Sequence, residues 1–199
     1  MPPVFAPLTG RYVDLRPLCE DDAELTLGWR LGERARLLNV GAATVAEQRQ
    51  WIAARPTSER NYVIVLKDGR PVGMLSLIAI NPVNRNAEPS RFLIGEEGAV
   101  KGIPAAVEAM SLLYGEAFDR LGLTRLYGTV VEGNGRMLKW QKYLGMREEG
   151  RLRRHYLIDG VWRDAIMVGL LEEEYRSVTL PRMKSLLAMG TMIMGDRNG

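Results

Sequence analysis

The stretch EGAVKGIPAAVEAM, residues 97–110, runs from a glycine-containing loop straight into a helix, and the elements around it decide the fold. We expect the helix to begin at about Pro104, because proline lacks only an N–H that would have no partner at the first helical position. Apolar residues recur at helical spacing from there to Leu121, and Gly122 follows as a stop. The sequence therefore predicts one helix over 104–121 with its positive end at this loop.

The mouth of this helix is a candidate phosphate-binding site. The first backbone N–H groups of a helix, here those of Ala105, Ala106 and Val107, have no partner inside it. The two alanines leave the approach open, and Lys101 adds a positive charge. The loop has neither the ending of a Walker loop nor the frame of a Rossmann fingerprint. These residues alone leave two alternatives: a phosphate or pyrophosphate site, and an ordinary turn.

Hydrophobic periodicity and turn residues predict the other elements. The predicted strands and hairpins cover residues 11–18, 61–80, 88–95, 124–131 and 155–171. The predicted helices cover 20–30, a segment from Val45 that carries Trp51 and Ile52, and 134–144. Both hairpins turn at an Asp-Gly pair, which tolerates positive φ. This order predicts one mixed α/β domain over 1–199, with a core over about 10–175 and a C-terminal extension over 176–199.

The composition is that of a single soluble globular domain. Of the 199 residues, 46% are hydrophobic and 26% are charged. The sequence has no run of eighteen apolar residues, so we expect no membrane span. The N-terminus lacks the pattern of a secretory signal. Cys19 is the only cysteine, which suits a reducing cytosol, so we expect a cytoplasmic protein.

Arginine is concentrated in two segments, 30–36 and 147–154, although the net charge is only +3. A solvated surface and a site for an anionic small molecule are the two interpretations. No long basic stripe with interleaved aromatic residues is present, so no nucleic-acid partner is expected.

A succession of motifs over residues 10–175 resembles the GNAT superfamily of acetyl-CoA-dependent N-acetyltransferases. These motifs are RPLCEDD (16–22), KGIPAA (101–106) followed by EAM, YGEAFDRLGL (114–123), Asn134 before a helix, LGM (144–146) and EGRLRRHYLIDGVWRDAIMVGLLEEEY (149–175). The first and the last of them match the RimJ/RimL-like branch. The loop departs from the family pattern Q/R-x-x-G-x-G/A, because Lys101 stands at its first position and Pro104 replaces its middle glycine.

The resemblance implies a GNAT-like fold: one central mixed sheet, mostly antiparallel and splayed at its middle, with helices on both faces. It also implies acetyl-CoA as co-substrate, no metal, and direct transfer of the acetyl group to a primary amine. The residues that it assigns to coenzyme binding are Phe92, Leu93 and Ile94 beside the pantetheine, Lys101, Gly102, Ile103, Pro104, Ala105 and Ala106 at the pyrophosphate, and Asn134 near the thiol.

The catalytic candidates are Glu88 and Asn134, which the resemblance implies, and Tyr156 on the next predicted strand. Glu88 would be the general base, and an exposed strand-end glutamate is the alternative. Asn134 also suits an ordinary helix N-cap. Many relatives carry a tyrosine seven residues after that asparagine, where this chain has Gln141. Tyr156 or the surface histidine His155 could protonate the leaving thiolate instead, or the thiolate could leave to solvent.

For the acceptor, the resemblance singles out Trp29 and Arg30, which lie in the region that shapes the acceptor pocket. A tryptophan-arginine pair there is similar to that of relatives that acetylate amino sugars carried on nucleotides. A buried tryptophan with a solvated or paired arginine is the alternative, and a protein N-terminus is the rival acceptor. A non-catalytic acetyl-CoA sensor is the alternative function, and a homodimer is possible.

Overall fold

A computed structural model describes residues 5–38 and 41–195, with the side chains of the last helix described up to Gly190. One sheet of eight strands runs through the molecule in the order β1-β2-β3-β4-β5-β6-β8-β7. The strands are β1 (Leu8–Thr9), β2 (Val13–Pro17), β3 (Arg60–Leu66), β4 (Pro71–Asn81), β5 (Asn86–Ile94), β6 (Arg125–Val131), β7 (Arg147–Ile158) and β8 (Val161–Leu171). Neighbours are antiparallel except β5 and β6, so the predicted mixed, mostly antiparallel sheet is confirmed.

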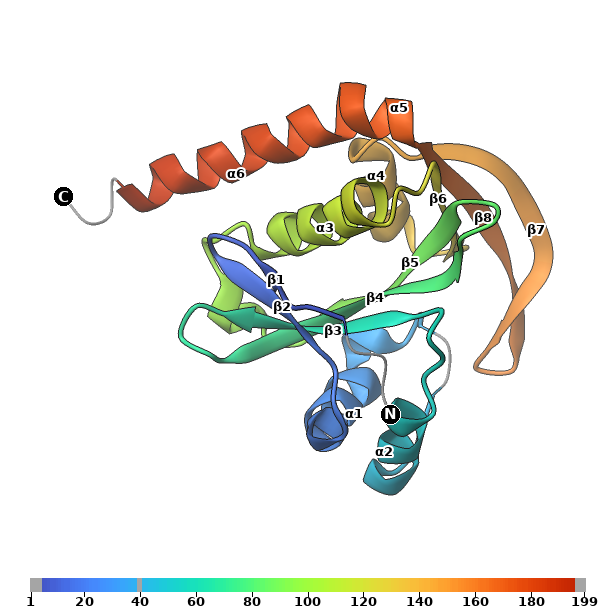
Figure 1. Cartoon of the computed structure of the whole chain (residues 1–199). Coiled ribbons are helices and arrows are strands. Elements are labelled where there is room, and N and C mark those ends of the chain that lie inside the picture. The colour runs from blue at the N-terminus through green and yellow to red at the C-terminus, as the bar shows by residue number, and fades with distance from the viewer. Residues whose placement is uncertain (1–4, 39–40, 196–199) are drawn as a thin grey trace.

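Helices cover both faces of the sheet (Figure 1). They are α1 (Ala23–Leu31), α2 (Val45–Ala53), α3 (Ala105–Gly115), α4 (Gly135–Tyr143), α5 (Glu172–Glu174) and α6 (Leu180–Gly195). α1 and α2 lie on one face, and α3, α4 and α6 lie on the other (Figure 1). The predicted capping box of α2 is present, since the Thr44 hydroxyl accepts from the Glu47 N–H and the Glu47 carboxylate accepts from the Thr44 N–H.

The sheet opens at its centre, between β5 and β6. These two parallel strands pair at only two positions, Asn86 with Arg125 and Ala87 with Leu126. Further along β5 the register with β4 shifts, and Arg91 takes a φ of 54°. A bulge of this kind bends the strand that carries it. β5 therefore turns away from β6, which is the predicted splay.

Two buried clusters hold the layers together. The main cluster lies between the sheet and α3, and it includes Tyr62, Leu75 and Met110. A smaller cluster on the α1 side contains Trp29 and Met74, together with Ala35, Val63 and Leu93. The predicted acceptor-binding residue Trp29 is thus part of the core.

Two predicted boundaries need correction, and one helix was not predicted. The helix after the glycine-containing loop begins at Ala105, and Pro104 is its N-cap with a φ of −82° and a ψ of 42°. Strand β7 begins eight residues before the predicted 155, because the charged segment 147–154 joins the sheet at its edge. Most of the C-terminal extension forms α6, for which the sequence predicted no helix.

Candidate active site

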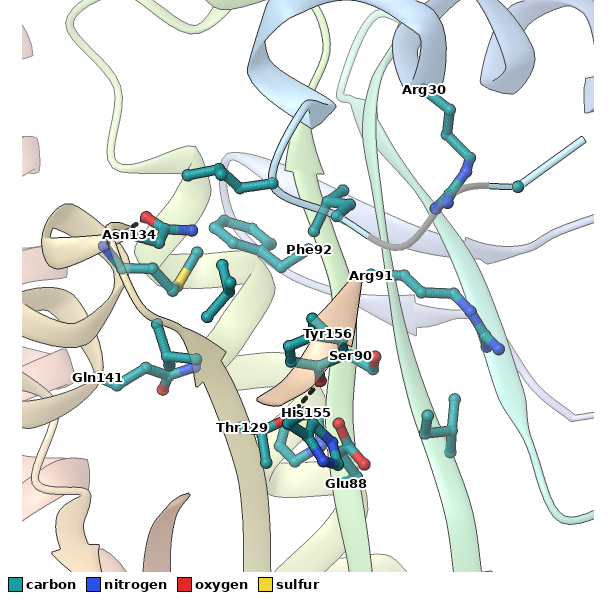
Figure 2. Close-up of a pocket in the computed structure, with 18 of the residues that line it drawn as sticks. Arg30, Glu88, Ser90, Arg91, Phe92, Thr129, Asn134, Gln141, His155 and Tyr156 are labelled. Atoms are coloured by element: carbon teal, nitrogen blue, oxygen red, sulfur yellow. Dashed lines mark hydrogen bonds between the residues drawn. The ribbon is translucent and has the colours of Figure 1, made fainter. Parts of the chain in front are cut away.

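A cavity of about 620 Å³ opens where β5 and β6 diverge. Its walls come from the end of α1, from α2 and the segment before it, from β4, β5, β6 and α4, and from β7 and β8. The polar and charged side chains that line it are Arg30, Gln48, Glu88, Ser90, Arg91, Tyr127, Thr129, Asn134, Gln141, His155 and Tyr156. All of these except Gln48 and Tyr127 are labelled in Figure 2. The splay thus brings together residues that are far apart in the sequence.

Glu88 lies on β5 opposite Ile78 of β4, at the point where β5 leaves β6. Gly128 of β6 lies beside it, since a Cβ added there would be 3.8 Å from the Glu88 Cγ. Partial burial raises the pKa of the Glu88 carboxyl, and the charge of Arg91 opposes this rise. A carboxylate with a raised pKa that lines a cavity is suited to take up a proton.

Tyr156 of β7 lies near Glu88 in the same part of the cavity (Figure 2). Its hydroxyl is 2.5 Å from the Thr129 Oγ1 on β6, and either atom can donate in this hydrogen bond. His155 is exposed and its ring meets Tyr156 edge-on, with 4.6 Å between the ring centroids. The β7–β8 hairpin therefore supplies two groups that can exchange protons.

Helix α4 forms the wall opposite the arginines (Figure 2). Asn134 is its N-cap, and its Oδ1 accepts from the Met137 N–H at 3.2 Å. Gln141 lines the cavity two turns further on, and its Oε1 accepts from the Tyr114 hydroxyl at 3.4 Å. Asn134 is thus an N-cap and a cavity residue together, while Gln141 can donate only a hydrogen bond.

The turn before α3 has the features of an anion site. Gly102 has a φ of 87°, in the region that glycine adopts without strain. The first N–H of α3 with a partner inside the helix is that of Glu108, which donates to the Pro104 carbonyl. The three N–H groups before it have no partner inside the helix. Ala106 is partly buried, whereas Lys101 is exposed. These residues fit a diphosphate, and Pro104 leaves the three donors in place.

Of the two predicted acceptor-binding residues, Trp29 and Arg30, only Arg30 lines the cavity. Trp29 is 7% exposed, donates from Nε1 to Glu96 Oε1 at 2.9 Å, and packs against Gly95 rather than lining the cavity. Arg30 does line the cavity, and burial lowers the pKa of its guanidinium, with a further contribution from the charge of Arg91.

Arg91 is a cavity residue that sequence reasoning missed. Its guanidinium donates to Glu59 and Asn61, each at 2.9 Å, and lies over the ring of Trp51. The positive φ that turns it toward the cavity follows from the bulge of β5. Thr129 was also missed, since a threonine in a strand is an ordinary β residue.

The described part of the chain offers neither a metal-binding cluster nor a membrane-spanning helix. Within residues 5–38 and 41–195, no group of three or more His, Cys, Asp or Glu side chains could hold a metal ion. None of the described helices has the length and apolarity needed to cross a bilayer.

Comparison with known proteins places the chain in a family. A family model described as "Acetyltransferase (GNAT) domain" matches residues 13–147. Spermidine N(1)-acetyltransferase of Escherichia coli K12 is 32% identical over 118 residues, which are 59% of this chain and 61% of that protein. The Bacillus subtilis protein named "Probable N-acetyltransferase YjcK" is 28% identical over 182 residues, with 84% of this chain and 98% of that protein covered.

A solved structure extends the likeness to the whole fold. The crystal structure of a GCN5-related N-acetyltransferase from Brucella melitensis has a TM-score of 0.77 and 26% identity, and the match covers 94% of this chain and 87% of that one. The chain spans less than two thirds of the spermidine acetyltransferase that it matches, at 61%. The family match covers most of this chain, and the chain belongs to the acetyltransferase (GNAT) domain family.

Proposed function

We propose that the protein is an acetyl-CoA-dependent N-acetyltransferase that moves the acetyl group directly to a primary amine. Membership of the family supports this proposal. The observation that carries it is the position of Glu88, a partly buried carboxylate that lines the cavity where β5 and β6 diverge. When bound, acetyl-CoA would supply the acetyl thioester.

The coenzyme would lie along β5 and end at the turn before α3. Phe92 lines the cavity, and Leu93 and Ile94 continue the strand toward that turn, so their backbone would face the pantetheine. Leu93 itself is 6% exposed and packs in the smaller core cluster, which leaves its backbone as the contact. The residues that would hold the diphosphate are Lys101, Gly102, Ile103, Pro104, Ala105 and Ala106.

Glu88 would act as the general base. An alkylammonium group is unreactive, so the acceptor amine must lose a proton before it attacks a carbonyl carbon. The raised pKa of Glu88 makes its carboxylate a better proton acceptor than an exposed glutamate. An oxygen of that side chain faces the same space as Thr129 and Tyr156 (Figure 2).

Tyr156 would protonate the departing thiolate. Its hydroxyl hydrogen-bonds to the Thr129 Oγ1 and lies in the cavity, whereas the Gln141 amide is not an acid and can donate only a hydrogen bond. Asn134, whose Oδ1 accepts from the Met137 N–H, would retain its side-chain N–H₂ as a donor at the coenzyme end of the cavity.

We propose that the acceptor carries an anionic group as well as its amine. Arg30 and Arg91 both line the cavity, and Glu88 is its one carboxylate among the described lining residues. Burial lowers the pKa of Arg30 and the charge of Arg91 lowers it further, so an anion between the two guanidinium groups would relieve their repulsion. Arg91 also forms an ion pair with Glu59, but Glu88 is the one carboxylate that the described lining residues offer to a polyamine, so we expect spermidine to be a poor acceptor.

Thiol release from acetyl-CoA in the presence of different amines tests both proposals. The panel is spermidine, glucosamine 6-phosphate, a nucleotide-linked amino sugar and a peptide with a free N-terminus. We expect the phosphorylated amines to react best. Glu88→Gln should lower kcat by about 10²–10⁴-fold, while Glu173→Gln, at an exposed position, should leave it unchanged.

The acceptor class has its own matched pair of variants. Arg30→Gln should lower kcat/KM for a phosphorylated amine about 10–100-fold, the loss of one charge-assisted hydrogen bond. Arg49→Gln, at an exposed position of α2, should not. If spermidine is the best acceptor, the proposal of an anionic acceptor is refuted, while the proposed acetyltransferase activity stands. If the chain binds the coenzyme but acetyl-CoA releases no thiol in the presence of any of the amines, the acetyl-CoA sensor is favoured. Gln141 in place of a tyrosine keeps this alternative open.

Three finer expectations remain predictions: membership of the RimJ/RimL-like branch, a cytoplasmic location and a homodimer. A protein N-terminus remains the rival acceptor, and the peptide in the panel tests it.

A further inference from the structure

The geometry of the turn before α3 depends on where Pro104 sits. Its carbonyl accepts from the Glu108 N–H at 3.0 Å, which makes it the first acceptor of the helix. The N–H groups of Ala105 and Ala106 follow directly in the chain. Because the proline ring is bonded to its own backbone nitrogen, a push on the ring moves the backbone. Any displacement of Pro104 would therefore change the direction of the free donors.

Helix α6 meets the turn at this residue. A Cβ added to Gly190 would lie 2.7 Å from Cγ, 2.8 Å from Cδ and 3.4 Å from Cβ of Pro104. Atoms at such distances must move apart, and a proline ring cannot rotate out of the way. Glycine inside a helix is unfavourable relative to alanine. The close approach to Pro104 is a physical reason for glycine at position 190.

The position of α6 over α3 is set by its first half. Met183 is fully buried, and Leu180, Leu186 and Leu187 pack against the main core cluster. The preceding Tyr175 is also buried, and its ring stacks on Phe118. Figure 1 shows α6 on the same face of the sheet as α3. α6 is thus anchored at one end and contacts the turn further along.

We propose that α6 is a clamp on the coenzyme-binding turn: Gly190 lets the helix seat directly on Pro104 and so holds the first amides of α3 in the direction that binds the diphosphate. The clamp lies outside residues 13–147, which match the family. It makes Gly190 a positioning residue, and it rests on the proposed binding of acetyl-CoA. It also explains how a proline is accommodated in this turn, since its ring fills the space that Gly190 leaves.

The first test is the binding of coenzyme A, without acceptor, measured by calorimetry. Gly190→Ala should raise the Kd about tenfold, equivalent to about 1.4 kcal/mol. Gly28→Ala is the matched control: it also adds a methyl group to a helical glycine, but no atom lies within 4 Å of the added Cβ. Its Kd should equal that of the unmodified chain.

Rescue separates the clamp from a general loss of structure. Pro104→Ala removes Cγ and Cδ, the two atoms closest to position 190, and keeps the atom at 3.4 Å. In that background Gly190→Ala should change the Kd less than twofold. A change of the same size with and without the proline ring would overturn the proposal, as would equal Kd values for Gly190→Ala and the unmodified chain.

A second measurement needs no variant. If the clamp favours coenzyme binding, then coenzyme binding must stabilise the docked α6 to the same extent. Trypsin should cut after the exposed Arg182 and Lys184 more slowly in the presence of coenzyme A, as mapped by mass spectrometry. If coenzyme A binds but the rate of cleavage in α6 is the same with and without it, the clamp is refuted and the proposed function is not. A chain that binds no coenzyme A would refute the proposed function, and the clamp with it.

Discussion

The carboxylate of Glu88 is placed between two opposing influences. Partial burial disfavours its charged form and raises the pKa, while the charge of Arg91 lowers it. The general base must be deprotonated to work, so the acid limb of kcat/KM against pH should lie above the ordinary glutamate pKa of about 4.3. Glu88→Gln should abolish this limb. A limb at the ordinary value would contradict the burial argument.

The same shift gives the sign of one contribution to stability. Because the folded-state pKa of Glu88 is raised, ionising this carboxyl costs more in the folded protein than in the unfolded chain. Its contribution to the free energy of unfolding therefore falls as pH rises from the unfolded-state pKa through the folded-state pKa. Urea denaturation of the chain and of Glu88→Gln across this range should show that the variant loses less stability.

The hydroxyl of Tyr156 can be separated from the tyrosine ring. Tyr156→Phe removes the group that hydrogen-bonds to Thr129 in the cavity, so kcat should fall about 10–100-fold while KM for acetyl-CoA changes little. Tyr143→Phe is the control, because Tyr143 is 49% exposed and does not line the cavity. Equal kcat values for the two variants would contradict this role of Tyr156 and indicate that the thiolate leaves to solvent.

At the scale of elements, one side chain joins α3 to the first strands. Glu108 is 5% exposed, and its carboxylate accepts from the backbone N–H groups of Arg11, Tyr12 and Val13 at 2.6–2.7 Å. Glu108→Ala would leave these donors without the carboxylate, so it should lower the free energy of unfolding by about 3 kcal/mol. Urea denaturation measures this. Glu173→Ala, at an exposed position, should stay within about 0.5 kcal/mol of the parent.

Helix α1 offers a change of the opposite sign. Gly28 lies inside the helix, is exposed, and has no atom within 4 Å of an added Cβ. Gly28→Ala should raise the free energy of unfolding by about 0.5–1 kcal/mol, because alanine loses less backbone entropy in a helix. Thermal unfolding checks it. A loss of stability would show that α1 needs a glycine for another reason.

For the whole molecule, the coenzyme should act as a stabilising ligand. At a concentration of about 100 Kd, a ligand that binds only the folded state stabilises it by about 2.7 kcal/mol. For a chain of 199 residues this should raise Tm by about 5–10 °C. Pantetheine lacks the diphosphate that the turn before α3 would bind, so it should raise Tm less. Equal shifts would place the binding energy elsewhere.

Much of this architecture could be predicted because the signals are local. The Asp68-Gly69 pair ends one run of β-branched residues and begins another, and the observed hairpin turns there. The spacing of Thr44 and Glu47 predicts the cap that starts α2. At the site, Glu88 and Asn134 were found from their place in a succession of motifs, and both line the cavity. Arg91 carries no such signal, because its direction depends on a bulge.

By itself the sequence determined the order of the elements from β2 to β8 and the start of a helix at the glycine-containing loop, because periodicity, capping and turn chemistry act between near neighbours in the chain. Only the tertiary structure decided that Trp29 is core while Arg30 faces the cavity, and that α6 seats on Pro104 through Gly190. These outcomes depend on contacts between segments far apart in the chain, where packing rather than local preference selects the arrangement.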